Sequence, residues 1–171
     1  MNAIKLLRAL DAAQNVSRWH TVRTLGRQNL AEHSYEVALI CARVGAPAFL
    51  IQRALEHDLG EEATGDVPAP FKRGAPSAGV LIERAEDQYA AEALGCLPGT
   101  AGIPADVWLL KFADIVSGLR FALDELELGN RRMLEGAVNF HLYMNRHWVD
   151  GARVPDNRWR DECLGLFDLM N

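Results

Sequence analysis

The chain has 171 residues, a length that indicates one domain or a compact domain with a short appendage. Hydrophobic residues make up 49% of it and charged residues 24%, as in soluble globular proteins. A formal net charge of −5 argues against broad binding to a nucleic-acid polymer, although it is compatible with a small basic pocket for one nucleotide. Three cysteines without a CxxC pair indicate free thiols in a reducing compartment.

The apolar pattern is helical from the N-terminus onward. Ile4, Leu7, Ala9 and Ala12 predict a short amphipathic helix, which ends near residue 15. This segment lacks the apolar block of a signal peptide, and no run in the chain reaches the ~20 apolar residues that cross a bilayer. We therefore expect a cytoplasmic protein without a membrane partner.

A loop over residues 18–28 follows, rich in His, Thr, Arg and Gly. Asn29 is suited to be the N-cap of a second helix that ends at Gly45. Pro47 is suited to open a third helix, which the pattern continues through residue 62.

Three of the seven prolines lie in segment 64–76, which is predicted to be a loop. Helical periodicity breaks again over residues 96–103. Four further helices are predicted, over residues 80–95, 104–128, 131–148 and 157–170. Because strand signals are nearly absent, we predict an all-α fold with a single domain of about six to eight helices over residues 1–171.

His57, Asp58 and Glu61 lie near the end of the third predicted helix. On such a helix, His57 and Glu61 are i,i+4 neighbours and Asp58 and Glu61 are i,i+3 neighbours, so all three can point to one spot. Imidazole nitrogens and carboxylate oxygens bind divalent transition metals such as Zn, Co, Mn or Fe. Glu61 is placed to take a proton from metal-activated water. Taken alone, however, such a run is more often a solvated helical face.

Two further residues are unusual for their surroundings. His33 lies close to the start of an otherwise apolar helix, where a histidine is more often part of the core and satisfied by a backbone partner. Asp114 lies in a nearly continuous apolar run, which is costly unless the carboxylate is paired or hydrogen-bonded. A buried salt bridge to Lys111, one turn earlier, is the alternative for Asp114. Four potential ligands on three predicted helices fit a single metal site better than four unrelated accidents.

The order H…HD…D is the signature of the HD superfamily of phosphohydrolases. The strings SRWHTVR, NLAEHS, HDLGEEATGDVPAPFK and LLKFAD are similar to segments of the YfbR-like 5′-deoxynucleotidases. They also resemble the small phage-encoded dATP triphosphohydrolases. The similarity covers roughly residues 15–120, so the predicted helices within 130–171 are expected to complete the core or to build an interface.

The resemblance implies a role for each matching position. Glu61 matches the catalytic carboxylate, and the metal ligands are matched by His33, His57, Asp58 and Asp114. The positions that match phosphate contacts are Arg18, Lys72 and Lys111. The positions that match nucleoside contacts are Trp19, Thr21, Asp66 and Pro70.

One divalent ion, Zn, Co or Mn, is the implied cofactor, and Mg²⁺ on the phosphate tail is a further candidate. Binuclear members of the superfamily place additional histidines between the HD pair and the last aspartate. Here His141 and His147 follow Asp114 instead, which favours one metal. The resemblance also implies a homo-oligomer, a dimer or a hexamer, and a host-cytoplasmic location if a phage encodes the chain.

The residue types agree with these roles. Arg18 offers a planar fork for bidentate phosphate binding, whereas Lys72 and Lys111 act as point charges. A surface position remains the alternative for Arg18, and core packing remains the alternative for Trp19. Arg120 and the neighbouring acidic residues Asp124, Glu125 and Glu127 indicate a solvated face.

The expected activity is metal-dependent hydrolysis of a deoxynucleotide, in which metal-bound water attacks the α-phosphate. The same ligand set would serve either of two activities. In the favoured one, a triphosphohydrolase converts a dNTP, with dATP preferred, into a deoxynucleoside and triphosphate. The alternative is a 5′-deoxynucleotidase acting on dNMPs. The Lys72–Arg73 pair, together with Lys111 and Arg18, slightly favours the longer phosphate chain. A remoter alternative is a non-catalytic nucleotide sensor, against which the ligand set and Glu61 argue.

Overall fold

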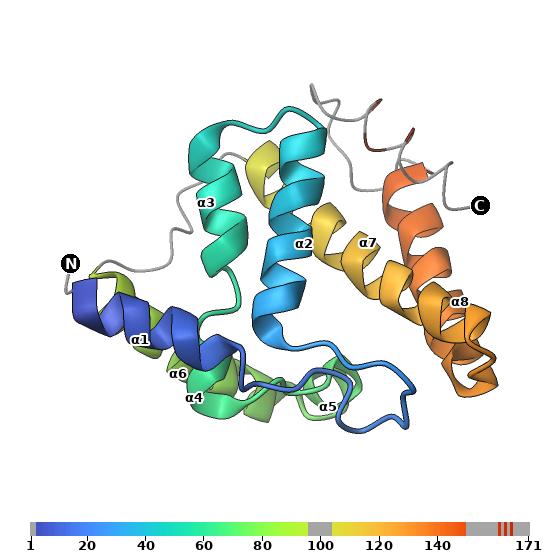
Figure 1. Ribbon diagram of the computed structural model, residues 1–171, viewed down its shortest axis with the longest axis horizontal. Helices are drawn as coiled ribbons and strands as arrows, with labels where there is room; N and C mark the ends of the chain where they lie inside the picture. Colours follow the sequence, from blue (N-terminus) through green and yellow to red (C-terminus); the bar gives the residue numbers. More distant parts are fainter. Residues whose placement is uncertain (1–2, 96–103, 150–160, 162, 164, 166–171) are drawn as a thin grey trace. The chain divides into compact units, whose positions relative to one another are not determined.

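A computed structural model describes residues 3–95, 104–149, 161, 163 and 165 (Figure 1). Its elements are α1 (Ala3–Ala13), α2 (Leu30–Arg43), α3 (Ala48–Glu56), α4 (Glu61–Thr64), α5 (Ala69–Gly74), α6 (Pro76–Leu94), α7 (Pro104–Glu127), the 3₁₀ turn η1 (Arg131–Met133), α8 (Leu134–Met144) and the π-helical turn η2 (Asn145–Val149). The predicted all-α fold is confirmed. The predicted break at 96–103 and most of the predicted helix at 157–170 lie outside the described residues. No described helix combines the length and apolar character needed to cross a membrane.

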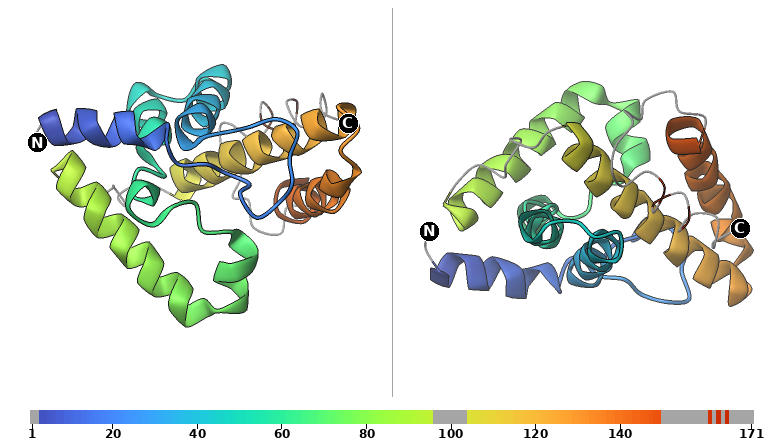
Figure 2. Two further views of the ribbon diagram at one scale, coloured as in Figure 1. Left: turned by 60° about the horizontal axis from the view of Figure 1, so that its bottom comes forward. Right: turned by 90° about the horizontal axis from the view of Figure 1, so that it is seen from above.

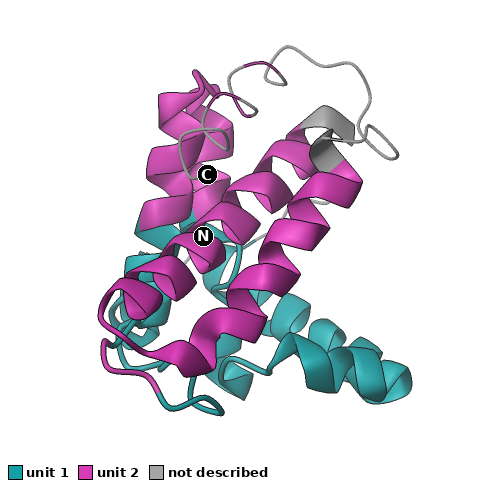
Figure 3. Ribbon diagram, turned by 90° about the vertical axis from the view of Figure 1, so that its right-hand side faces the viewer, with its two compact units in different colours: residues 1–23, 27–35, 55–100 teal, residues 24–26, 36–54, 101–171 magenta. Residues whose placement is uncertain are grey.

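The chain divides into two compact units, shown in different colours in Figure 3. Unit 1 comprises residues 1–23, 27–35 and 55–100, and unit 2 comprises residues 24–26, 36–54 and 101–171. The boundaries between the two units fall within the loop before α2, within α2, within α3 and after residue 100. That the whole chain forms one domain stays a prediction.

The start of α2 is defined by a reciprocal cap, as predicted for Asn29. The Asn29 side chain accepts a hydrogen bond from the backbone N–H of Glu32 at 2.9 Å, and the Glu32 carboxylate accepts one from the backbone N–H of Asn29 at 2.9 Å. This capping box satisfies two donors that a helix start leaves without partners. It fixes the first turn of α2, where His33 is the fourth residue.

Unit 1 is built along α6. Its small apolar core joins Ala9 of α1 and Leu59 to three residues in the C-terminal half of α6, Ala90, Ala93 and Leu94. Figure 2 shows α1 beside that end of α6 and α5 at the other end. Ala9 and Ala13 are the buried residues of α1, whereas Ile4 and Leu7, which the sequence placed on the apolar face, are 64% and 65% exposed.

The segment predicted as a proline-rich loop contains two helices, the end of α4 and all of α5. In α5, Pro68 is the N-cap and Pro70 occupies the second helical position. Helix-start positions need no backbone N–H donor, so prolines that end a helix elsewhere are compatible with this one. The loop prediction was therefore wrong for residues 69–74.

Unit 2 is built around α7, which packs against α8. A Cβ on Gly118 would lie 2.9 Å from the Phe140 ring, so the absence of a side chain lets the two helices approach closely. The second part of α2 is joined to α7 through Glu36, which accepts hydrogen bonds from Ser117, at 2.7 Å, and from Arg120. Ser117 is fully buried, so this polar link lies inside the unit.

Glu125 does not belong to a solvated face, as the sequence indicated, although Arg120 and Asp124 are exposed and form an ion pair at 2.9 Å. The Glu125 side chain is only 1% exposed. It accepts hydrogen bonds from the backbone N–H groups of Leu25 and Gly26 and from the Asn130 side chain. These donors stabilise a buried carboxylate, which the local pattern of charged residues could not reveal.

Candidate active site

His57 and Asp58 do not continue the third helix, as the sequence predicted. Helix α3 ends at Glu56, residues 57–60 form a turn, and Glu61 begins α4. Backbone bonds from Leu59 N–H to Glu56 and from Glu61 N–H to Asp58 join residues three apart, which winds the chain more tightly than an α-helix. All three predicted residues, His57, Asp58 and Glu61, nevertheless line one pocket.

Gly60 allows the turn to pass directly against α6. A Cβ at this position would lie within 3 Å of backbone atoms of Glu86, a separation that real side chains do not adopt. Gly60 is buried and has a φ of −64°, so space rather than backbone conformation requires glycine here. The close approach fixes the turn of residues 57–60, here called the HD turn, against the helix that forms the other wall of the pocket.

We expect Gly60→Ala to lower the free energy of unfolding by about 1–3 kcal/mol, as overpacking typically does. Because the turn must move, metal affinity should fall as well. Chemical denaturation and metal titration measure the two effects. Gly74→Ala is the matched control, since a Cβ there meets nothing within 4 Å. Equal stability and metal affinity in the two variants would contradict the role of Gly60.

Three predicted metal ligands converge within unit 1. One ligand atom from each of His33, His57 and Asp58 lies within 4.8 Å of the others. Asp58 Oδ2 is 3.2 Å from His57 Nε2 and 3.5 Å from His33 Nε2, and the two imidazole rings are tilted with centroids 5.4 Å apart. His33 is fully buried, and the side chains of His57 and Asp58 are largely buried.

This donor set fits a divalent transition metal. Two imidazole nitrogens and one carboxylate oxygen are ligands that zinc and its neighbours share, and catalytic zinc sites commonly use three protein ligands. The nitrogens already point to the same carboxylate oxygen, so little rearrangement is needed for all three to reach one ion. Three of the four residues from which the sequence predicted a metal site are thus brought together, although His57 and Asp58 lie in a turn and not in a helix.

Arg18 is part of this cluster and is not a surface arginine. Its Nη1 lies 3.3 Å from Asp58 Oδ2, and its side chain is 14% exposed. The guanidinium is therefore fixed beside the predicted ligands by a charged partner on the HD turn. An arginine held in this way is positioned to bind an anion, such as a phosphate, next to the metal.

Glu61 lies in the pocket with one oxygen available. The residue is 9% exposed, and its buried Oε2 accepts no hydrogen bond from the described part of the chain. Burial, followed by the negative charge of Asp58, raises the pKa of Glu61 to about 9, and Arg18 partly opposes this shift. A buried carboxyl group with a raised pKa, beside a metal-ligand cluster, is typical of groups that exchange protons in catalysis.

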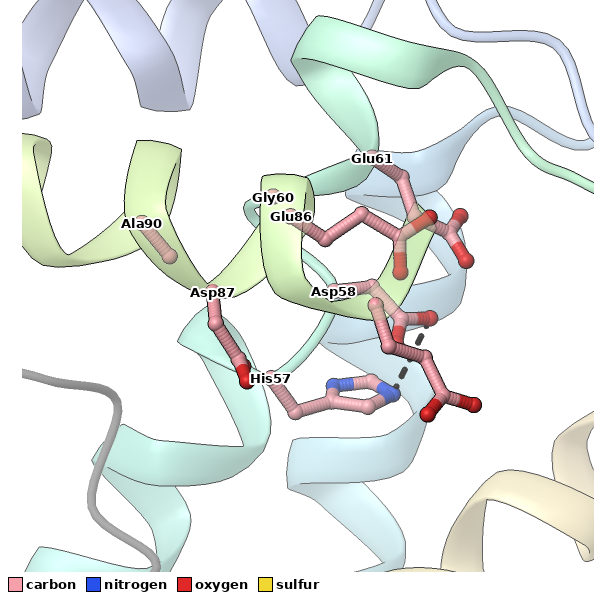
Figure 4. Close-up of a pocket in the computed structure, with 8 residues that line it drawn as sticks. His57, Asp58, Gly60, Glu61, Glu86, Asp87 and Ala90 are labelled. Atoms are coloured by element: carbon pink, nitrogen blue, oxygen red, sulfur yellow. Dashed lines mark ion pairs between the residues drawn. The ribbon is translucent and has the colours of Figure 1, made fainter. Parts of the chain in front are cut away.

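The opposite wall of the pocket comes from α6 and was missed by the sequence analysis. It is lined by Glu83, Glu86, Asp87 and Ala90. Figure 4 shows the carboxylate of Glu86 extending from this wall toward that of Glu61. The signal was present as acidic residues at i, i+3 and i+4 of one helical face. It was indistinguishable from an ordinary solvated face, because nothing local shows that this face meets the HD turn.

Lys72 is held by Glu86 in this structure. Its Nζ lies 3.3 and 3.4 Å from the two carboxylate oxygens of Glu86, which also accepts a hydrogen bond from Thr64 at 3.0 Å. Glu86 therefore fixes the ammonium of Lys72 near the pocket. Its predicted contact with phosphate stays a prediction.

The predicted nucleoside contacts are less closely grouped. Trp19 is half-buried, its indole N–H donates to Gln28 Oε1 at 3.0 Å, and its φ of 60° is unusual for a residue with a side chain. Thr21 and Pro70 are exposed, and Asp66 is half-buried. The negative charge of Asp66 contributes to the raised pKa of Glu61, which places it near the pocket.

Asp114 and Lys111 lie on α7, in unit 2. Lys111 Nζ is 2.6 Å from Asp114 Oδ2, so the salt bridge that the sequence offered as the alternative is present. The pair is not buried, since the Lys111 side chain is 52% exposed and that of Asp114 is 21% exposed. The role of Asp114 as a fourth metal ligand stays a prediction.

The chain is similar to known proteins of one family. Residues 5–140 match the family model described as 5′-deoxynucleotidase YfbR-like. The dATP triphosphohydrolase of Cyanophage S-2L is 34% identical over 117 residues, which cover 64% of this chain and 65%, just under two thirds, of that protein. The 5′-deoxynucleotidase PM0747 of Pasteurella multocida is 28% identical over 167 residues, covering 84% and 86% of the two chains.

The solved structure of the Cyanophage S-2L HD phosphohydrolase DatZ, bound to dA and one catalytic Zn²⁺ ion, has a TM-score of 0.74 to this chain. The two share 28% sequence identity, and the match covers 99% of this chain and 96% of that one. The helical fold and the clustered histidines and aspartate thus define an HD-type phosphohydrolase. More particularly, the chain belongs to the YfbR-like 5′-deoxynucleotidase family.

Proposed function

We propose that this protein is a metal-dependent deoxynucleotide phosphohydrolase that converts dATP into deoxyadenosine and triphosphate. The observation that carries the proposal is the convergence of His33, His57 and Asp58 next to Arg18 and Glu61. These residues supply metal ligands, an anion-binding cation and a proton acceptor within one unit. A non-catalytic sensor would have no need of a buried carboxyl group beside the ligand cluster.

His33, His57 and Asp58 are the residues that would hold the cation, with Asp114 as the proposed fourth ligand. When bound, a divalent metal would neutralise phosphoryl charge and lower the pKa of coordinated water. The metal-bound relative contains Zn²⁺, and the same donor set suits Co²⁺ and Mn²⁺. Which ion this protein uses is part of the proposal, and zinc is our choice.

Three residues of the chain bind the phosphates and transfer the proton. Arg18 binds a non-bridging oxygen of the α-phosphate and orients the phosphorus toward the pocket. Glu61 accepts the proton of the attacking water through Oε2, and a proton returns from Glu61 to the 5′ oxygen of deoxyadenosine as the P–O5′ bond breaks. Burial and the negative charge of Asp58 raise the pKa of Glu61. Glu61 can therefore accept a proton once a cation compensates the charge of Asp58. Lys72 binds the phosphate chain in exchange for its contact with Glu86.

The length of the phosphate chain distinguishes two candidate activities. Relatives of both kinds exist, a dATP triphosphohydrolase and a 5′-deoxynucleotidase, so the family alone is compatible with either. We favour the triphosphate because Arg18 and Lys72 are two cations that flank the pocket, and the structural relative is a phage HD phosphohydrolase that holds dA. The 5′-deoxynucleotidase activity on dNMPs is the second candidate.

The test is a product assay on the full chain with added Zn²⁺, Co²⁺ or Mn²⁺. Incubation with dATP should release deoxyadenosine and inorganic triphosphate, whereas dAMP should release little orthophosphate. Faster release of orthophosphate from dNMPs would replace our first candidate by the second. If neither dNTPs nor dNMPs were turned over with any of the three metals, both enzymatic proposals would be wrong.

Arg18→Ala should chiefly weaken binding of the nucleotide. Hydrogen bonds to charged groups are worth about 1.5–3 kcal/mol, so we expect KM to rise about 10- to 100-fold. Steady-state kinetics with dATP at saturating metal measures the change. Arg23→Ala, an exposed arginine in the same loop, is the matched control. Unchanged KM and kcat in Arg18→Ala would limit Arg18 to its ion pair with Asp58.

A further inference from the structure

The loop of residues 18–28 carries Arg18 and Trp19 and is closed at its base. Ser17 and Asn29 form an isolated antiparallel bridge. Next to it, Arg18 N–H donates to Gln28 O at 3.0 Å, and Leu30 N–H donates to Val16 O at 3.0 Å. These bonds hold the two ends of the loop together within unit 1, but they leave its central residues to other contacts.

The far part of the loop is held by Glu125, within unit 2. Leu25 N–H lies 2.8 Å from Oε2 and 3.1 Å from Oε1 of this carboxylate, and Gly26 N–H lies 2.5 Å from Oε1. Asn130 Nδ2 donates to Oε2 at 2.6 Å, which fixes the carboxylate from the opposite side. Two consecutive backbone donors thus bind one buried side chain about 100 residues later in the chain.

The carboxylate is suited to this task because it is ionised. Although burial alone would raise the pKa of Glu125, the hydrogen bonds from Asn130, Leu25 and Gly26 hold it below its ordinary value. Hydrogen bonds to a charged acceptor are stronger than those between neutral groups. The loop is also fitted closely to Glu125, since a Cβ on Gly26 would lie 3.1 Å from Oε1.

We infer that Glu125 is a positioning residue for nucleotide recognition, which acts by fixing the loop of residues 18–28. The inference rests on the proposed function for the roles of Arg18 and Trp19 in binding the nucleotide. It adds a residue that need not touch the substrate. The loop is closed by the bonds between its two ends, and Glu125 holds it at residues 25 and 26. With Glu125 bound to Leu25 and Gly26, the backbone between Trp19 and Leu25 has few conformations open to it. Without that contact, the loop would be held only by the bonds at its base and by the contact of Trp19 with Gln28, and the backbone that carries Arg18 and Trp19 would be less firmly fixed.

The test is Glu125→Gln, a substitution of nearly equal volume. The amide keeps one acceptor oxygen but places an NH₂ group against backbone N–H donors, so the contact with the loop is lost in part. We expect KM for dATP to rise about 10-fold, on the scale of one hydrogen bond to a charged group, while kcat changes less than about 3-fold. Trypsin should cleave the folded variant faster after Arg23 and Arg27, both of which are exposed in this loop.

Glu127→Gln on the same helix is the matched control, because Glu127 is exposed and the same charge is removed. It should keep the wild-type KM and the wild-type rate of cleavage. Glu125→Asp keeps the charge on a shorter side chain and should restore part of the protection. If Glu125→Gln does not fold, Asn130→Ala removes the donor to Glu125, together with the cap of η1 that its side-chain oxygen provides, and should show the same two changes to a smaller extent.

Two outcomes would overturn the inference. One is a wild-type KM with wild-type protection of the loop in Glu125→Gln. The other is a fall in kcat with an unchanged KM, which would place Glu125 in the chemical step or in general stability. Failure of the proposed function is a separate result, because it appears as a lack of turnover in the wild-type protein. In that case the trypsin experiment still shows whether Glu125 fixes the loop.

Discussion

Asp58→Ala should lose bound divalent metal and phosphohydrolase activity together. Asp58 Oδ2 is the atom that both imidazole nitrogens and Arg18 Nη1 approach, at 3.2, 3.5 and 3.3 Å. Removing it takes away the only carboxylate of the cluster in unit 1 and leaves three donors without their common acceptor. Changes in residues that merely orient a metal ligand typically cost 10- to 100-fold in affinity or activity, so loss of the ligand itself should exceed about 100-fold.

Titration of the metal-free protein with Zn²⁺ or Co²⁺ measures the affinity, and the dATP product assay measures activity. Asp87→Ala is the matched control, because Asp87 is an exposed carboxylate that lines the same pocket. It should keep stoichiometric metal and most of the activity. Stoichiometric tight metal binding by a folded Asp58→Ala protein would show that the cluster of His33, His57 and Asp58 is not the metal site.

Glu61→Gln should lose about 10²–10⁴-fold in kcat and keep its affinity for metal and nucleotide. General acid–base catalysis contributes on this scale, and the amide preserves the shape of the side chain without accepting a proton. Glu62→Gln, one residue further along α4, is the control for a change of charge in this helix. A loss of only a few-fold in kcat would remove Glu61 from the role of proton acceptor.

The same variant should be more stable than the wild type when metal is chelated. The pKa of Glu61 is raised from 4.5 to about 9 in the folded protein, so between these values the folded state binds a proton that the unfolded state has released. The free energy of unfolding of the wild type therefore falls as the pH rises from about 4.5 to about 9. The neutral amide has no such dependence. Near neutral pH the difference should be about 3 kcal/mol, since pH 7 lies about 2.5 units above 4.5 and each unit corresponds to about 1.4 kcal/mol.

Chemical denaturation of both proteins at pH 5 and pH 8, with a chelator present, tests this expectation. The variant and the wild type should have similar stability at pH 5 and should differ at pH 8. Saturating metal should reduce the difference, because a cation near Asp58 favours the ionised form of Glu61. Equal stability of the two proteins at both pH values would mean that Glu61 is not held in a buried, proton-binding state.

Features with a local cause could be predicted from the sequence. The N-cap at Asn29 and the helix predicted over residues 104–128 depend on residues a few positions apart, and both are confirmed, the helix over Pro104–Glu127. The residues of the ligand cluster were also found, because histidine and aspartate in this order resemble the HD superfamily. The prediction of a continuous helix through His57 failed because a turn of bonds between residues three apart keeps a nearly helical spacing of side chains.

Features with a distant cause could not be predicted. Gly60 is required by the backbone of Glu86, and Glu125 is buried by Leu25 and Gly26, so the partners lie 26 and about 100 residues away. Neither contact can be inferred from the spacing of nearby residues in the sequence. The acidic wall of the pocket on α6 could not be predicted for the same reason, because its residues line a pocket only where α6 faces the turn that carries His57 and Asp58. The expected homo-oligomer stays a prediction.

The positive φ of Trp19 bears on how the substrate preference of such an enzyme could be altered. A residue with a side chain pays about 1–2 kcal/mol for this backbone conformation, which glycine adopts freely. The bonds at the base of the loop and the contact of the indole with Gln28 hold the strained geometry in place. Glycine at position 19 would remove this cost together with the contact to Gln28, whereas any other residue would pay the same backbone cost as tryptophan. Redesign there would vary the surface that we propose for the base, and the bonds between the ends of the loop would hold its path.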